Sequence, residues 1–163
     1  MIWICPTCKR KLKGPNQYHS CFISDKEYHL KRMNENVRDV FYSLLSHLQS
    51  FEGIEIIYLK TCIQFKTVST FLSIYTKRDR LELEFQLGRE DDYFPIYKCK
   101  RISKNRVLHR LAIGEPSDID EQVKLWIRDA YYLISKMWQS SILSFKFFKM
   151  IKTILIMGSF KPY

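Results

Sequence analysis

The chain has 163 residues, of which 46% are hydrophobic, and it carries a formal net charge of +10 at pH 7. A chain of this size and composition supports one domain with a hydrophobic core and small appendages, which argues against several full-sized domains. The positive charge favours anionic partners, namely nucleic acid, acidic lipid or an acidic protein, and does not choose among them.

The N-terminal sequence MIWICPTC lacks the basic region, the apolar region and the small-residue cleavage site of a secretory signal. We therefore expect a cytoplasmic protein with reduced cysteines. The five cysteines are also an odd number. In a cytoplasmic protein, a Cys-x-x-Cys motif indicates either a metal site or a redox pair.

Residues 1–24 are predicted to form a small zinc-binding hook. The spacing Cys5-x2-Cys8-x10-His19-x-Cys21 supplies three thiols and one imidazole, the ligand types of closed, structural zinc sites. A turn at Gly14-Pro15-Asn16 lets the two halves meet. Four cations of the hook would offset the charge of three thiolates and are candidate nucleic-acid or anion contacts: Lys9, Arg10, Lys11 and Lys13. A structural zinc of this kind does no chemistry.

Three alternatives to a zinc site with these four ligands stay open: a different fourth ligand, a redox pair and an incidental cluster. The single residue between His19 and Cys21 is a shorter spacing than in common zinc fingers, so His29 is an alternative fourth ligand. The cluster can also be a thiol redox pair or incidental. The redox pair is disfavoured because thioredoxin-like motifs follow a strand, and the segment before Cys5 is too short for one.

Residues 25–138 are predicted to form an α+β domain that begins with helices. A short helix or turn is expected over 25–33, and a longer helix follows with one apolar face. Asn34 or Asn36 can cap the longer helix, and Gly53 marks its end. The apolar face consists of Val37, Val40, Phe41, Leu44, Leu45 and Leu48.

A period of two, clearest in the sequence LELEFQL of residues 81–87, predicts strands with one solvated face. The predicted strands are 54–58, 61–66, 69–75, 80–87 and 106–113. The short connections favour hairpins, so we expect an antiparallel meander sheet. Residues 88–105 are predicted to be a long polar loop.

The next helix is indicated by Pro116 and by Ser117-x-x-Asp120, an acidic variant of the capping box. An apolar stripe follows, formed by Val123, Trp126, Ile127, Ala130, Tyr131 and Ile134. Two amphipathic helices packed on one sheet complete the predicted α+β fold.

Several short motifs occur in a fixed order along the chain: Trp3-x-Cys5-Pro6-x-Cys8, Asn16-Gln17-x-His19-Ser20-Cys21, LKTCIQF at 59–65, His109, and Asp120-x-x-Val123-x-x-Trp126-x-x-x-Ala130-Tyr131. Together they resemble a bacterial domain of unknown function, some members of which carry the label "predicted transport protein" and some of which have this cysteine-histidine hook in front. The resemblance covers roughly residues 1–135. It implies an α+β domain and no established reaction.

Residues 139–163 depart from that family and are predicted to form a basic, apolar C-terminal tail. Residues 141–157 are rich in Ile, Leu, Phe and Met, with Lys146, Lys149 and Lys152 spaced by three. The tail can form an interfacial helix that binds a membrane weakly, pack on the domain, pair two chains, or reflect an altered reading frame. A membrane span is disfavoured because the apolar stretch is short and carries three lysines.

The strongest candidate for binding in the domain is a basic segment preceded and interleaved by Tyr93, Phe94 and Tyr97. Its cations can contact phosphates while the aromatic rings stack on bases. The alternative for each charge run is a solvated surface. The candidate nucleic-acid or anion contacts here are Lys98, Lys100, Arg101, Lys104, Arg106 and Arg110.

A second candidate is a pocket for a small anion, possibly catalytic, around Lys60 and His109. The structural alternative is stronger, since a lone strand histidine is more often hydrogen-bonded within the fold and an edge lysine is more often solvated. No catalytic residues are assigned, because the sequence contains no Ser-His-Asp order, phosphate loop or HExxH motif. We therefore expect a non-enzymatic module that contacts nucleic acid, with no small-molecule substrate assigned.

Overall fold

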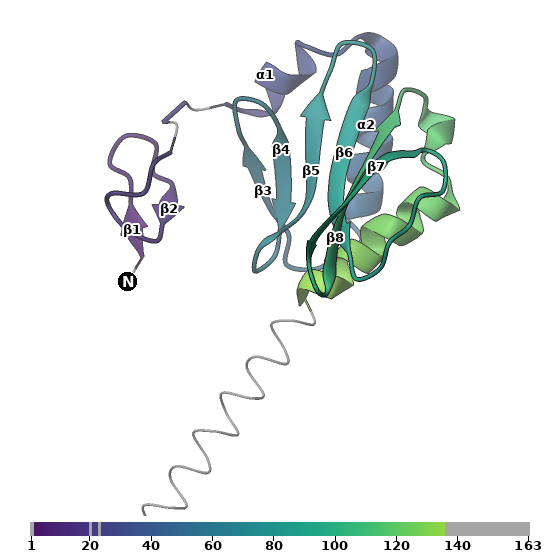
Figure 1. Cartoon of the computed structure of the whole chain (residues 1–163). Helices are drawn as coiled ribbons and strands as arrows, with labels where there is room; N and C mark the ends of the chain where they lie inside the picture. Colours follow the sequence, from purple (N-terminus) through teal and green to yellow (C-terminus); the bar gives the residue numbers. More distant parts are fainter. Residues whose placement is uncertain (1, 20, 23, 136–163) are drawn as a thin grey trace, which may run out of the picture.

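The computed structural model describes residues 2–19, 21–22 and 24–135 (Figure 1). The tail predicted over 139–163, with its possible membrane contact or self-association, lies outside these residues. The N-terminal hook contains a two-stranded antiparallel ribbon of β1 (Trp3–Ile4) and β2 (Lys11–Leu12), in which Trp3 pairs with Leu12. In Figure 1 the hook lies beside the β3 edge of a larger sheet.

The larger sheet has six antiparallel strands in the order β3-β4-β5-β6-β8-β7. The strands are β3 (Glu55–Tyr58), β4 (Ile63–Lys66), β5 (Thr70–Thr76), β6 (Leu81–Leu87), β7 (Ile96–Ser103) and β8 (Arg106–Ile113). All five predicted strands are present, within two residues at each end. The α+β class and the antiparallel sheet are therefore confirmed.

The last hairpin departs from a simple meander. Strands β3 to β6 follow one another in space, but β8 pairs with β6 and β7 forms the outer edge. The prediction of a loop over 88–105 is wrong for β7, Ile96–Ser103. Seven of the eight residues of β7 are exposed, so an edge strand of this kind lacks the alternation of apolar and polar residues that reveals a half-buried strand.

The helices begin at polar caps. In α1 (Lys26–Leu30) the carboxylate of Asp25 accepts from the Tyr28 N–H, and in α2 (Glu35–Leu48) the Asn34 side chain accepts from the Val37 N–H. The short helix before Met33 and the Asn34 cap are thus confirmed. The Asn36 amide donates instead to the Gly114 carbonyl.

The third helix, residues 121–135 of the described part, begins later than its predicted capping box. A 3-10 turn η1 (Pro116–Asp118) comes first, and Asp118 accepts from the Gly114 and Glu115 N–H groups. Asp120 then caps the helix by accepting from the Val123 N–H at 2.8 Å. The acidic residues lie at a helix start as expected, with Asp120 as the cap itself.

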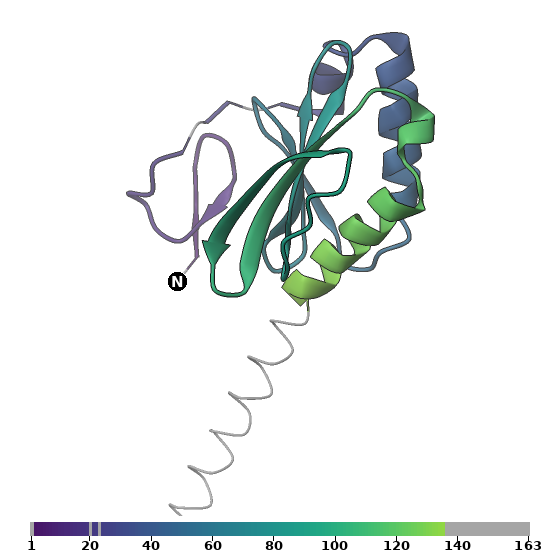
Figure 2. The same ribbon diagram turned by 45° about the vertical axis from the view of Figure 1, so that its right-hand side comes forward.

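The core lies between one face of the sheet and two helices. Figure 2 shows α2 and the 121–135 helix on the same side of the sheet. The alternating residues of β6 and β8 that face them are buried, and Trp126 is the largest fully buried side chain. The described helices leave the opposite, outer face of the sheet uncovered, and this face carries Glu84 and Arg110.

Candidate metal centre and basic surfaces

Four side chains of the hook converge on one point. The ligand atoms of Cys5, Cys8, His19 and Cys21 all lie within 4.8 Å of one another. The Sγ atoms of Cys5 and Cys21 are 3.7 Å apart, and the Cys21 Sγ atom lies 3.4 Å from His19 Nε2. Metal–sulfur bonds of about 2.3 Å in a tetrahedral site place two sulfurs about 3.8 Å apart. The Cys5–Cys21 distance matches this spacing, and the group as a whole can hold a metal ion.

The Cys-x-x-Cys turn is built by backbone hydrogen bonds. The Lys9 N–H donates to the Cys5 carbonyl at 2.9 Å, and the Cys5 N–H donates to the Arg10 carbonyl at 3.0 Å. Lys9 has a φ of 58°, the left-handed region that favours glycine. This turn brings the Cys5 and Cys8 thiols to the same side of the ribbon, where both reach the cluster.

His19 is oriented by its second ring nitrogen. Its Nδ1 atom lies 2.9 Å from the Gln17 carbonyl, which can only accept, so Nδ1 carries the proton. The lone pair of Nε2 then faces the thiols, as a metal ligand requires. The Gln17 side chain in turn accepts from the Lys13 N–H at 2.9 Å. The turn between the two halves thus supports the ligand geometry.

The clustered groups perturb one another's protonation. Hydrogen bonding from the Cys8 N–H, with a smaller contribution from His19, lowers the pKa of Cys5 to about 6. The pKa of Cys21 is raised, chiefly by its contact with the Cys5 sulfur. The Gln17 carbonyl raises the pKa of His19. Cys5 therefore ionises before Cys21, and a metal ion would displace the protons of its thiol ligands.

His29, the alternative fourth ligand, lies elsewhere. It is fully buried, with Nε2 2.8 Å from the Leu59 carbonyl and Nδ1 3.0 Å from Thr76 Oγ1. Burial lowers its pKa. The neutral ring donates to Leu59 and accepts from Thr76, which ties α1 to the sheet. The cluster found in the described part of the chain does not include it.

The basic segment forms the β7–β8 hairpin at one edge of the sheet. Cross-strand pairing places Lys98 beside Arg110 and Lys100 beside Leu108, on the outer face. Lys98, Lys100 and Lys104 are exposed, and within residues 24–135 the structure shows no ion-pair partner for any of the three. These lysines form the free positive charge of the hairpin.

The arginines of the hairpin are engaged within the fold. Arg110 pairs with Glu84, and its guanidinium lies 5.5 Å from the Tyr75 ring centre. Arg101 pairs with Glu90 at 3.0 Å. Arg106 donates to the Gln86 side chain at 3.4 Å. These arginines contribute positive charge to the surface, but each guanidinium already contacts another side chain of the fold. A ligand would have to bind the guanidinium alongside that contact.

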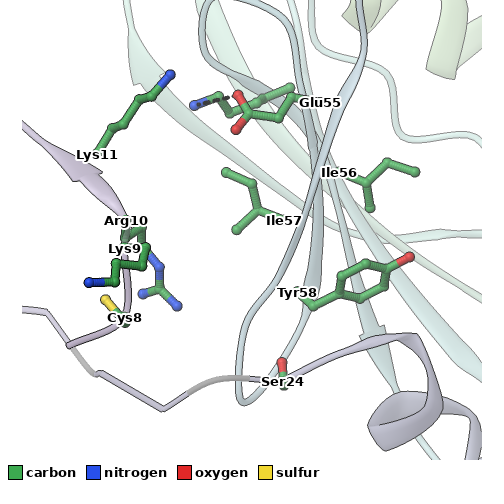
Figure 3. A pocket seen from close by; sticks show the side chains of 10 residues that line it. Cys8, Lys9, Arg10, Lys11, Ser24, Glu55, Ile56, Ile57 and Tyr58 are labelled. Carbon is green, nitrogen blue, oxygen red and sulfur yellow. Dashed lines mark ion pairs between the residues drawn. The ribbon is translucent and has the colours of Figure 1, made fainter. Parts of the chain in front are cut away.

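Three of the hook cations line a cleft against the sheet. Lys9, Arg10 and Lys11 face β3 across a space of about 320 Å³ (Figure 3). Lys13 does not line this space. The hook cations and the hairpin lysines therefore lie near the two opposite edge strands, β3 and β7.

The structure does not bring Lys60 and His109 together. The Lys60 ammonium lies 5.8 Å from the Phe22 ring centre, next to the β3–β4 turn, while His109 is in β8, beyond β4, β5 and β6. His109 is buried against Phe85, and its Nε2 accepts from the Asp91 N–H at 3.2 Å. Burial lowers the pKa of His109. A hydrogen-bonded structural histidine describes it better than a shared anion pocket.

Sequence reasoning missed the role of Asp91. One carboxylate oxygen of Asp91 accepts from Trp126 Nε1 at 2.8 Å, and Arg89 links Asp91 to Asp129. These contacts close the 88–95 segment over the 121–135 helix. No residue spacing indicates this contact, because it joins positions 35 residues apart through a segment without regular structure.

No helix in the part of the chain that the structure describes combines the length and the apolarity needed to cross a membrane. No curated protein and no solved structure shows significant similarity to the chain. A family model, the domain of unknown function DUF5655, matches residues 26–134. The match begins after the hook and confirms the resemblance for the domain that follows it. The chain therefore belongs to the DUF5655 family.

Proposed function

We propose that this protein is a non-enzymatic binding module that contacts nucleic acid through backbone phosphates, with a hook held by structural zinc. Zinc is the favoured metal because three thiols and one imidazole form a soft, four-coordinate ligand set. With four protein ligands the ion has no open position, so its role is to hold the hook in shape.

The observation that carries the nucleic-acid proposal is the set of lysines on the β7–β8 hairpin. Lys98, Lys100 and Lys104 are exposed at an edge of the sheet whose outer face no described helix covers (Figure 2). The Tyr93, Phe94 and Tyr97 rings nearby are also exposed, by 75%, 93% and 55%. Lysines supply sequence-independent phosphate contacts, and exposed rings can stack on unpaired bases.

The test is fluorescence anisotropy of the zinc-loaded chain with a labelled duplex and a labelled single strand, titrated at several salt concentrations. Phosphate binding weakens as salt rises, because each neutralised phosphate releases a counterion. In Lys98→Glu/Lys100→Glu we expect affinity to fall for both probes and the logarithmic salt slope to decrease by about 2.

A matched control is Lys31→Glu/Arg128→Glu, which changes the net charge equally at exposed positions away from the hairpin. Its affinity should fall much less than that of the hairpin variant. Equal losses in the two variants would mean that net charge alone attracts the probes. A chain with no salt-dependent affinity for duplex DNA, single-stranded DNA or RNA would overturn the proposed function.

A further inference from the structure

The cleft between the hook and the sheet has features of a ligand site. Its volume of about 320 Å³ lies at the small end of the range of protein ligand pockets, about 300–1,000 Å³. One wall is the hook and the other is formed by β3 and Lys66 of β4, with Ser24 between them (Figure 3). The lining residues are Cys8, Lys9, Arg10, Lys11, Ser24, Glu55, Ile56, Ile57, Tyr58 and Lys66.

The cleft carries an excess of positive charge. Lys9, Arg10 and Lys11 come from the hook, and the only carboxylate in the lining, Glu55, is already paired with Lys66 at 3.3 Å. A zinc ion with three thiolates adds about one negative charge. The three hook cations outnumber that charge, so an anion is the ligand type that the cleft favours.

The cleft also contains one polar side chain that lacks a partner. The Ser24 hydroxyl is buried, and no atom in the described ranges accepts from it or donates to it. Buried hydroxyls are normally hydrogen-bonded, and one facing a cleft indicates a missing ligand or water. In addition, β3 is an outermost strand, so one edge of its backbone pairs with no strand. Phosphate oxygens can accept from both kinds of donor.

The shape of the cleft selects among anions. Ile57 points toward the hook in Figure 3 and offers an apolar surface opposite the cations. A duplex is too wide for a space of this volume, whereas one nucleotide combines a phosphate with a flat, largely apolar base. An acidic peptide added as a strand would run along the whole edge of β3, past the Glu55 carboxylate, and is disfavoured for that reason.

We propose that this cleft holds one nucleotide of a single strand, with its phosphate against Lys9, Arg10 and Lys11 and its base on Ile57. The proposal rests on the proposed function, since it assigns a strand form to part of the nucleic-acid contact. The hairpin lysines then contact phosphates of any strand form, and the cleft adds a preference for single strands. Metal binding supports this preference because it holds the cationic wall in place.

The experiment compares Lys11→Glu and Ile57→Asp with Lys13→Glu in the full zinc-loaded chain. Lys13 belongs to the same hook but does not line the cleft, so Lys13→Glu makes the same charge change as Lys11→Glu outside the site. The probes are a labelled hexathymidylate strand, a labelled duplex and a labelled hexaglutamate peptide. Zinc content, measured for every variant, shows whether the hook is intact.

We expect Lys11→Glu and Ile57→Asp to lose about tenfold in single-strand affinity, with a much smaller change for the duplex and for Lys13→Glu. A metal chelator should cause a similar selective loss in the wild-type chain. Unchanged single-strand affinity in both cleft variants overturns the inference, even if the hairpin variant loses binding as proposed above. Peptide binding that depends on Lys11, without such an effect on the single strand, overturns it in favour of an acidic peptide. Wild-type protein that binds no nucleic acid defeats both proposals.

Discussion

The hook and the α+β domain are held together by different forces. In the domain, buried aliphatic and aromatic side chains from the four inner strands β4, β5, β6 and β8 and from two large helices form one continuous core. In the described part of the hook, Cys5 is the one apolar side chain buried to that degree. A segment this small cannot bury enough surface to offset its conformational entropy, so its order depends on the ligand cluster. The two regions should therefore respond to different perturbations.

Metal removal should give the largest difference between the two regions. Structural zinc contributes about 10–16 kcal/mol of apparent binding free energy in small zinc-dependent folds. Chelation should therefore disorder the hook while the domain stays folded. Hydrogen exchange of the backbone amides would then be rapid only in the hook, which comprises about the first 24 residues of the chain.

The matching substitution is Cys8→Ser, with Cys62→Ser as its control. Cys62 is a buried cysteine of the domain that lies outside the cluster. Elemental analysis should give about one zinc per wild-type or Cys62→Ser chain and much less for Cys8→Ser. Full zinc content in Cys8→Ser would contradict the four-ligand site.

The reverse perturbation is a cavity in the domain core. Phe41 of α2 is 1% exposed, and Phe41→Ala should lower the free energy of unfolding by about 3–5 kcal/mol. Zinc content should not change, because the metal ligands come only from the hook. Urea denaturation monitored by circular dichroism measures the first effect.

The control for this substitution is Leu125→Ala, in a side chain that is 37% exposed on the 121–135 helix. Its cost should be clearly smaller. A Phe41→Ala chain that loses zinc at neutral pH in the absence of denaturant would show that the stabilities of the hook and the domain are coupled and not independent.

Acidification should destabilise the domain through buried imidazoles. Burial lowers the pKa of His29 and of His109, so the folded state binds fewer protons than the unfolded state near pH 6. The stability that these neutral rings contribute is complete above the unfolded pKa of about 6.5 and is lost as pH falls toward the lower folded values. Urea midpoints measured from pH 7.5 to pH 5 should decrease.

The variant His29→Gln tests the cause, because glutamine can donate and accept but does not titrate in this range. Its urea midpoint should change less between pH 7.5 and pH 5 than that of the wild type. An unaltered pH dependence would assign the effect to other groups.

The sequence predicted those structural features that depend on a pattern within a few neighbouring residues. The ligand spacing of the hook, the Asn34 cap and the alternation in β6 are each contained within a few residues, and all three were recovered. Strand β7 and its position at the edge of the sheet, outside β8, were not predicted, because an exposed edge strand has no buried face that would produce an alternating pattern. The Asp91–Trp126 contact and the cleft beside β3 were also missed, since both arise from segments distant in sequence.

The smallest effect concerns Lys9, where the structural and binding roles of the hook oppose each other. Its φ of 58° costs a non-glycine residue about 1–2 kcal/mol. Lys9→Gly should relieve that cost and raise zinc affinity several-fold, as measured by competition with a chromophoric chelator. The same variant removes one cation from the cleft, so its single-strand affinity should decrease while metal binding improves. An increase in both zinc affinity and single-strand affinity would show that the order of the hook, and not the charge of Lys9, limits nucleic-acid binding. An unchanged zinc affinity would indicate that the turn is unstrained.

Zinc affinity and single-strand affinity are expected to move in opposite directions in Lys9→Gly. This one substitution therefore separates the structural contribution of the metal from the electrostatic contribution of the Lys9 side chain.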